Sequence, residues 1–314
     1  MTTALIFPGQ GSQAVGMGRS LADAFPVAKA VFDEVDAALS QKLSTLMWEG
    51  PAEELTLTAN AQPALMAVSL AVVRVLEAEA GLDLGRDAAF VAGHSLGEYS
   101  ALAAAGTFSV SDAARLLRIR GDAMQKAVPA GQGAMAALLG AELDLAREIA
   151  AAAAQGEVCE AANDNGGGQV VLSGAKSAID RAIALATERG VKRAMLLPVS
   201  APFHCALMQP AAEAMQEALA KVAMQAPVVP VMANVGAAPL SDPEAIRASL
   251  VAQVTGTVRW RECVQAMAAA GVDDFVELGS GKVLAGLVKR IAAGTATASV
   301  GTAEDIAAYK ARKG

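Results

Sequence analysis

Short apolar runs alternate with amphipathic stretches in the first third of the chain. The runs at 4–7 and 88–92 predict buried strands, and the apolar spacing over 27–39 and 61–79 predicts helices. Parallel strands need such helices as crossovers, and the helices then cover both faces of the sheet. This part of the chain therefore predicts an α/β unit with a mostly parallel sheet.

The middle of the chain shows a different order of elements. The pattern predicts strands at 133–139, 158–162, 169–173 and 191–197 and helices at 143–154 and 179–189. This βαββαβ order is typical of a ferredoxin-like arrangement, and the glycine run at 166–168 fits a turn within it. We therefore expect residues 129–198 to form an insert in a larger unit made of residues 1–128 and 199–314.

Composition and charge exclude several classes of protein. The 314 residues are 54% apolar, which is enough for a substantial core, and a net charge of −7 is unsuited to binding nucleic acid. The mean hydropathy of +0.39 comes mainly from alanine-rich helices, and no apolar run approaches the roughly 18 residues that span a bilayer. The first residues lack a basic region, so we expect no signal peptide or membrane anchor and a cytoplasmic location.

The three cysteines are far apart and have no CxxC spacing. We expect free thiols, and no spacing suggests a metal site or a redox cofactor. Cys205 follows His204 directly, but neighbouring side chains usually diverge, so a small buried residue is the better interpretation.

The clearest chemical signal is a G-x-S-x-G motif at residues 93–97, centred on Ser95. It follows a predicted strand and precedes a helical run that ends before Gly106. A serine on such a tight strand-to-helix turn is exposed at the carboxyl edge of a sheet, beside the N–H groups of a helix N-terminus. The alternative is a serine that only caps a helix. The surrounding strand and helix favour a nucleophile.

A serine nucleophile needs a base, and histidine is the usual one. The chain has two histidines. His94 is adjacent to Ser95, and we expect its side chain to point elsewhere along the turn. His204 is therefore the candidate base, with a histidine buried in the core as the alternative interpretation.

Seven short motifs occur along nearly the whole chain. They are FPGQGSQ at 7–13, GHSLGEYSAL at 93–102, RG at 120–121, ANDN at 162–165, QVV at 169–171, APFH at 201–204 and VRW at 258–260. In this order they resemble the motifs of malonyl-CoA:acyl carrier protein transacylases. The resemblance implies an α/β-hydrolase-like body with a ferredoxin-like insert. This is the architecture that the pattern of elements predicts independently.

The resemblance also implies roles for individual residues. Ser95 would take the malonyl group as an ester and His204 would move the proton. The backbone N–H groups of Gln10 and Leu96 would form the oxyanion hole, and the backbone carbonyl of Gln253 would orient the base. A neutral carbonyl in this position stabilises an imidazolium less than a carboxylate does.

The pocket of the family suggests how the acyl group is selected. Arg120 would bind the free carboxylate of malonyl through parallel N–H donors, whereas the residues alone do not distinguish it from Arg115 and Arg118. Phe203 would occupy the space of a methyl branch and so favour malonyl over methylmalonyl. The remaining pocket candidates are His94, Asn163 and Asn165, although asparagines in a glycine-rich segment are often only turn formers.

The implied reaction is ping-pong transfer of malonyl from malonyl-CoA to the phosphopantetheine thiol of acyl carrier protein, which supplies extender units for fatty acid biosynthesis. An esterase or thioesterase, or a subunit that only binds an acyl carrier, are the alternatives. We expect a monomer that needs no cofactor. An acidic carrier requires a basic docking surface. The candidates are Arg189, Lys192 and Arg193, with Lys289 and Arg290 as a second choice.

Overall fold

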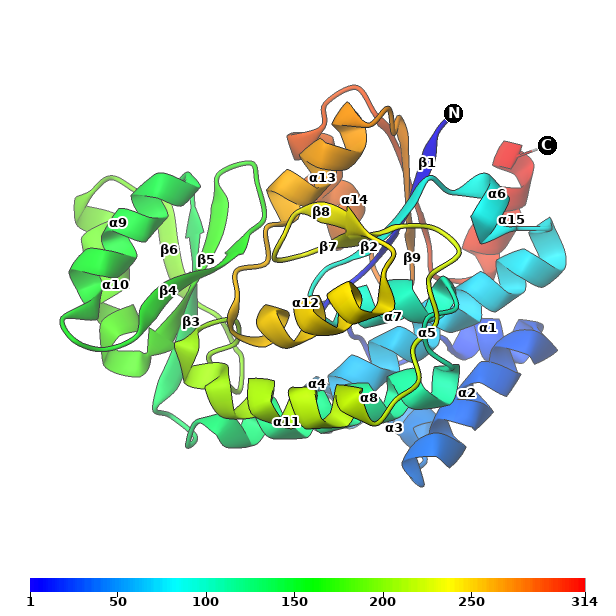
Figure 1. The fold of residues 1–314 in the computed structure, drawn as a ribbon, viewed down its shortest axis with the longest axis horizontal. Helices are drawn as coiled ribbons and strands as arrows, with labels where there is room; N and C mark the ends of the chain where they lie inside the picture. Colours follow the sequence, from blue (N-terminus) through cyan, green and yellow to red (C-terminus); the bar gives the residue numbers. More distant parts are fainter. Residues whose placement is uncertain (314) are drawn as a thin grey trace.

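The computed structural model describes residues 1–313 as two groups of strands with helices around them (Figure 1). The strands are β1 (Thr3–Phe7), β2 (Phe90–Gly93), β3 (Gly133–Leu139), β4 (Cys159–Asp164), β5 (Gln169–Ala175), β6 (Arg193–Leu196), β7 (Val231–Ala233), β8 (Ala238–Leu240), β9 (Asp274–Leu278) and β10 (Ala296–Val300). The helices before the insert are α1 (Arg19–Ala24), α2 (Pro26–Leu39), α3 (Leu43–Glu49), α4 (Ala52–Thr56), α5 (Thr58–Ala80), α6 (Leu84–Asp87), α7 (Leu96–Ala104) and α8 (Val110–Ala127). The others are α9 (Leu143–Ala154), α10 (Lys176–Glu188), α11 (Gln209–Ala220), α12 (Pro243–Thr255), α13 (Trp260–Ala269), α14 (Val283–Ile291) and α15 (Ala303–Lys313), with a short 3₁₀ helix at Ala206–Met208.

The larger sheet has the strand order β10-β9-β1-β2-β7-β8, and every neighbouring pair is parallel except β7 with β8. Side chains of β1 alternate between two cores. Leu5 and Phe7 face the core that includes α5, α7 and α8, while Ala4 and Ile6 face the core that includes α13 and α14. Both faces are covered, so the predicted α/β unit with a mostly parallel sheet is confirmed.

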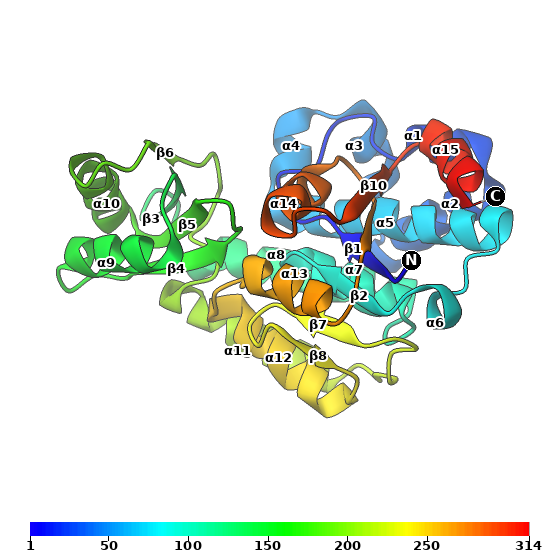
Figure 2. The same ribbon diagram turned by 90° about the horizontal axis from the view of Figure 1, so that it is seen from above.

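The second sheet is entirely antiparallel and has the order β4-β5-β3-β6. Helices α9 and α10 pack on one face around Leu138, Ile149 and Ile179. This is the strand order of a ferredoxin-like βαββαβ unit. In Figure 2 this green part lies beside the rest of the chain. The division into residues 129–198 and the two flanking segments stays a prediction.

The predicted elements of the middle segment differ from the observed ones mainly at their ends. Strand β3 and helix α9 have the predicted bounds, and β4 continues two residues beyond the predicted 162. Strand β6 is shorter than the predicted 191–197, because the N–H of Val191 donates to Ala186 and closes the turn after α10. The glycine run at 166–168 is the β4–β5 connection, and all three glycines have positive φ.

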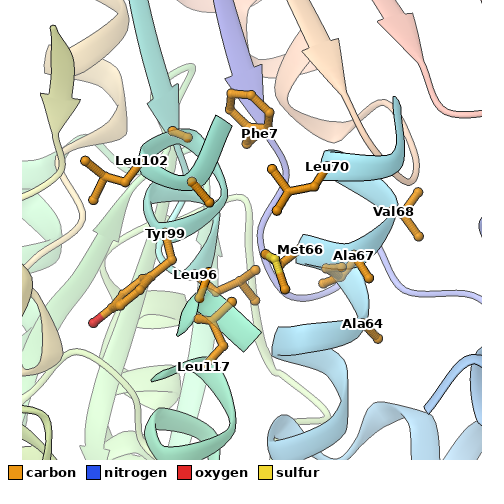
Figure 3. Packing of buried hydrophobic residues seen from close by; sticks show 14 of the residues in the cluster. Phe7, Ala64, Met66, Ala67, Val68, Leu70, Leu96, Tyr99, Leu102 and Leu117 are labelled. Carbon is orange, nitrogen blue, oxygen red and sulfur yellow. The ribbon is translucent and has the colours of Figure 1, made fainter. Parts of the chain in front are cut away.

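Helix α5 contradicts the expectation that no apolar stretch could cross a membrane. Its length and composition would allow it, because an 18-residue stretch of the helix has a mean hydropathy of 1.4. However, 83% of that stretch is buried inside the protein. Figure 3 shows Met66 of this helix near Leu96 of α7, with Leu70 on the same side of the helix. Helix α5 is therefore a core helix in this structure, and it supports the helix that follows Ser95.

Backbone hydrogen bonds join the end of β4 to the larger unit. The N–H of Asp164 donates to Val258, and the N–H of Val258 donates to Ala162, at 2.9 and 2.8 Å. The carboxylate of Asp164 also pairs with Arg261 at 2.8 Å. These contacts hold the second sheet next to the edge where β2 ends.

Candidate active site

Ser95 lies at the junction of β2 and α7 with a φ of 54°, a strained value for a residue that has a side chain. The turn is possible because its neighbours are glycines. A Cβ at Gly93 would lie 1.9 Å from the carbonyl of Gly97, and a Cβ at Gly97 would lie 2.3 Å from the carbonyl oxygen of Phe7. The predicted strand, turn and helix around Ser95 are all present.

The structure brings His204 to Ser95 across 109 residues of sequence. Its Nε2 lies 2.8 Å from Ser95 Oγ, and its Nδ1 lies 2.8 Å from the backbone oxygen of Gln253. Because that carbonyl can only accept, Nδ1 carries the proton and Nε2 is free to accept the serine hydroxyl. Burial, followed by the positive charge of Arg120, lowers the pKa of His204 to about 3, so its ring is neutral at physiological pH.

Arg120 reaches the same point from α8, and its side chain is only 1% exposed. Its Nη2 donates to Ser95 Oγ at 3.1 Å and to Gln253 Oε1 at 2.9 Å, and its Nη1 donates to Gln62 Oε1 at 2.8 Å. All three acceptors are neutral. Burial lowers the pKa of Arg120. A buried cation with only neutral partners is suited to receive an anionic ligand.

The other two arginines of α8 are far less suited to this position. Arg115 pairs with Asp112 at 3.3 Å, and 54% of its side chain is exposed. Arg118 donates to Asn60 and Gln41. Only packing distinguishes Arg120 from them, because all three lie on one helix.

A cavity of about 480 Å³ opens above Ser95. Most of the predicted site residues line it, together with apolar side chains from α8, β3 and the segment after β6. The lining includes Gln10, Gln62, His94, Ser95, Leu96, Arg120, Met124, Met135, Asn163, Leu197, Val199, Phe203 and His204. Gln10 follows β1 and Leu96 begins α7, so the two residues that are candidates for the oxyanion hole approach Ser95 from neighbouring parallel strands.

His94 points away from the base, as expected. Its Nε2 lies 2.9 Å from the side-chain oxygen of Asn165, and burial lowers its pKa. Asn165 does not line the cavity directly but contacts it through His94, whereas Asn163 lies in its wall. Phe203, next to His204, also faces the cavity.

The sequence analysis missed three polar residues that surround the site. Asn234 accepts the N–H of Ser95 at 2.8 Å and donates to the carbonyl of Gly93 at 2.7 Å. Glu98 accepts the N–H of Asn234, and Gln62 contacts Arg120. Glu98 could have been noticed as the only charged residue of the apolar helix LGEYSALAA. Asn234 and Gln62 lie in no motif that the analysis used.

Metal ligands and cysteines are the remaining groups of the described residues that could carry chemistry. Among residues 1–313, no group of three or more His, Cys, Asp or Glu side chains could hold a metal ion. The three cysteines are free and buried, as predicted, and burial raises the pKa of Cys205 to about 11.

Comparison with known proteins places this chain among acyltransferases. Residues 4–307 match the acyl transferase domain family. The chain is 46% identical over 304 residues to the malonyl CoA-acyl carrier protein transacylase of Bacillus subtilis strain 168, covering 96% of this chain and 94% of that protein. The protein of the same name from Escherichia coli strain K12 is 47% identical over 288 residues, covering 92% of each.

Two solved structures are similar over almost their whole length. An acyl-carrier-protein S-malonyltransferase from Bartonella henselae is 58% identical with a TM-score of 0.96, and the match covers 98% of each chain. A malonyl-transacylase solved in complex with its type II PKS acyl-carrier protein is 41% identical with a TM-score of 0.96, covering 99% of this chain and 100% of that one.

Proposed function

The chain belongs to the acyl transferase domain family, and from this premise we propose that it transfers malonyl from malonyl-CoA to the phosphopantetheine thiol of an acyl carrier protein. Arg120 carries the proposal. Its buried guanidinium lies 3.1 Å from Ser95 Oγ and contacts only neutral acceptors. The carboxylate of malonyl would supply the missing anion, whereas an acetyl or fatty acyl group would leave the cation unpaired.

The first half-reaction begins with Ser95 Oγ attacking the thioester carbonyl of malonyl-CoA while His204 Nε2 takes the hydroxyl proton. The N–H groups of Gln10 and Leu96 stabilise the oxyanion. The tetrahedral intermediate collapses, the C–S bond breaks, and His204 returns the proton to the coenzyme A thiolate. Malonyl is then held as an ester on Ser95.

The second half-reaction repeats these steps with a different thiol. His204 takes the proton of the phosphopantetheine thiol, and the sulfur attacks the malonyl ester. The bond to Ser95 Oγ breaks, and His204 returns the proton to the serine. The backbone oxygen of Gln253, 2.8 Å from Nδ1 of His204, orients the base, so this mechanism uses no carboxylate in contact with His204.

The same proposal includes the cofactor requirement, the acyl selectivity, the oligomeric state and the location of the enzyme. Ser95, His204 and Arg120 provide the nucleophile, the base and the binding group, so the proposed reaction needs no cofactor. Phe203 would crowd a methyl branch and favour malonyl over methylmalonyl. We further propose a monomeric, cytoplasmic enzyme that provides extender units for fatty acid synthesis.

The test is the mass of the intact protein after mixing with malonyl-CoA, followed by addition of acyl carrier protein. Wild type should gain one malonyl group and lose it to the carrier, while Ser95→Ala should gain none. An adduct that decays equally fast without the carrier would support a hydrolase, and the absence of any adduct would contradict an acyl-enzyme mechanism.

A further inference from the structure

A buried carboxylate lies behind the nucleophile. Glu98 is in the first turn of α7, three residues after Ser95, and is 1% exposed. Its Oε2 accepts the N–H of Asn234 at 3.0 Å and Nε2 of Gln253 at 2.8 Å. Its Oε1 has no hydrogen-bond partner within residues 1–313. Burying a carboxylate with so few partners is unfavourable, and the proposed steps of transfer do not use it.

Gln253 connects this carboxylate to the reacting groups. Its Nε2 donates both to Glu98 and to the backbone oxygen of Ser95, the latter at 3.0 Å. Its Oε1 accepts Arg120 Nη2 at 2.9 Å, and its backbone oxygen faces His204 Nδ1 at 2.8 Å. One residue thus contacts the nucleophile, the base and the arginine.

Three neighbours of Gln253 set the order of donors and acceptors in this chain of hydrogen bonds: Glu98, the backbone oxygen of Ser95, and Arg120. An ionised carboxylate can only accept, so it requires the NH₂ end of the Gln253 carboxamide. The oxygen end then faces Arg120, which can only donate. Arg120 Nη2 also donates to Ser95 Oγ, so the serine hydrogen is left to point at His204.

We propose that Glu98 is a positioning residue that, through the carboxamide of Gln253, fixes Arg120 where it can bind the carboxylate of the acyl group. The inference rests on the proposed malonyl transfer. Glu98 itself contacts neither substrate nor reacting atoms. Together with the backbone oxygen of Ser95, its charge holds the NH₂ end of Gln253, so that the oxygen end meets the guanidinium.

Removing the charge should therefore weaken selection for malonyl. In Glu98→Gln, the carboxamide oxygen can still accept from Asn234 and Gln253, but without the charge it is a weaker acceptor, so the carboxamide of Gln253 is held less firmly. A Gln253 that is held less firmly would let the guanidinium of Arg120 move from the position that suits the carboxylate of the acyl group. A neutral acetyl group does not use Arg120, so its transfer should be far less affected.

The experiment compares the rates at which malonyl-CoA and acetyl-CoA acylate Ser95, measured from the mass of the intact protein. It is done at about pH 8, because burial raises the pKa of Glu98 to about 7 and the carboxylate is then mostly ionised. Glu98→Gln should lower the malonyl-to-acetyl ratio about ten-fold, equivalent to about 1.4 kcal/mol. A merely structural role would slow both donors equally. If the ratio is unchanged while wild type acylates normally, the inference fails and the proposed function stands.

Glu277→Gln is the matched control, because Glu277 is also fully buried and accepts two backbone N–H groups, but from α14 and away from Ser95. It should lower thermal stability and leave the ratio unchanged. If Glu98→Gln does not fold, the ratio is measured on Glu98→Asp, whose carboxylate is one methylene short of Gln253, and the same decrease is expected. An unchanged ratio there would overturn the inference.

A double-mutant cycle tests the route of the effect. Gln253→Leu keeps the backbone carbonyl that faces His204 but removes the carboxamide. If Glu98 acts through that carboxamide, adding Glu98→Gln to Gln253→Leu should change the ratio little further. Fully additive effects would show that Glu98 acts by another path and would refute the positioning role.

Discussion

Replacing Arg120 with methionine tests the residue that carries the proposed specificity. The substitution removes a buried cation that lies 3.1 Å from Ser95 Oγ and keeps an unbranched apolar side chain in its place. It should affect malonyl-CoA and acetyl-CoA very differently, because only malonyl has a carboxylate for the guanidinium to bind.

The expected magnitude follows from the bonds that are lost. A guanidinium can give a carboxylate two parallel hydrogen bonds, and a hydrogen bond to a charged group contributes about 1.5–3 kcal/mol. Two of them sum to about 3–6 kcal/mol, so kcat/KM for malonyl-CoA should fall about 10²- to 10⁴-fold. The rate with acetyl-CoA should hold or rise, because a neutral acyl group no longer meets an unpaired cation.

The assay is the release of coenzyme A from each donor in the presence of acyl carrier protein. Arg115→Met is the matched control on the same helix, since 54% of that side chain is exposed and it pairs with Asp112 instead. It should leave both rates unchanged. An equal fall for malonyl and acetyl in Arg120→Met would mean that Arg120 only supports the fold, and the reasoning would be refuted.

Two other predictions concern the base and the carrier. Because burial and the charge of Arg120 lower the pKa of His204 to about 3, the base stays neutral until the pH falls towards that value. In Arg120→Met this pKa should rise, so the acid limb of the acylation rate should move to higher pH; an unmoved limb would exclude the arginine as a cause. Lys192 and Arg193 are exposed at the start of β6, an edge strand of the second sheet, and reversing both to glutamate should raise the KM for the carrier and not that for malonyl-CoA. An unaltered carrier KM would locate docking elsewhere.

The local pattern of apolar and polar residues was sufficient to predict most strands and helices, but not how they are arranged. The strands and helices of the middle segment were predictable because each shows a clear period of apolar residues. The order β10-β9-β1-β2-β7-β8 was not, because pairing β1 with β9 joins Thr3 to Asp274 across most of the chain. No local spacing encodes such a contact. Helix α5 was predicted as a helix over 61–79, but its apolar length was underestimated, because polar residues within it, such as Ser69, interrupt the apolar run without making the helix polar overall.

The residues of the candidate site were likewise only partly predictable from sequence. Ser95 could be found from a motif, and His204 because the chain has only two histidines. Arg120 could be selected only by resemblance, since its environment depends on how α8 packs against α5 and α7. Glu98 and Asn234 come from segments far apart in sequence, so their hydrogen bond has no spacing that could predict it.

The geometry links substrate selection to the strength of the base. In the free enzyme the cation of Arg120 lies near His204 and lowers its pKa, which disfavours the imidazolium that must form when Ser95 is deprotonated. On the proposed roles, a bound malonyl carboxylate would offset that charge, so the imidazolium would be less unfavourable with malonyl than with acetyl. Malonyl should then be favoured in the chemical step as well as in binding. Single-turnover acylation at saturating donor separates the two, and equal maximal rates for malonyl and acetyl would confine the role of Arg120 to binding.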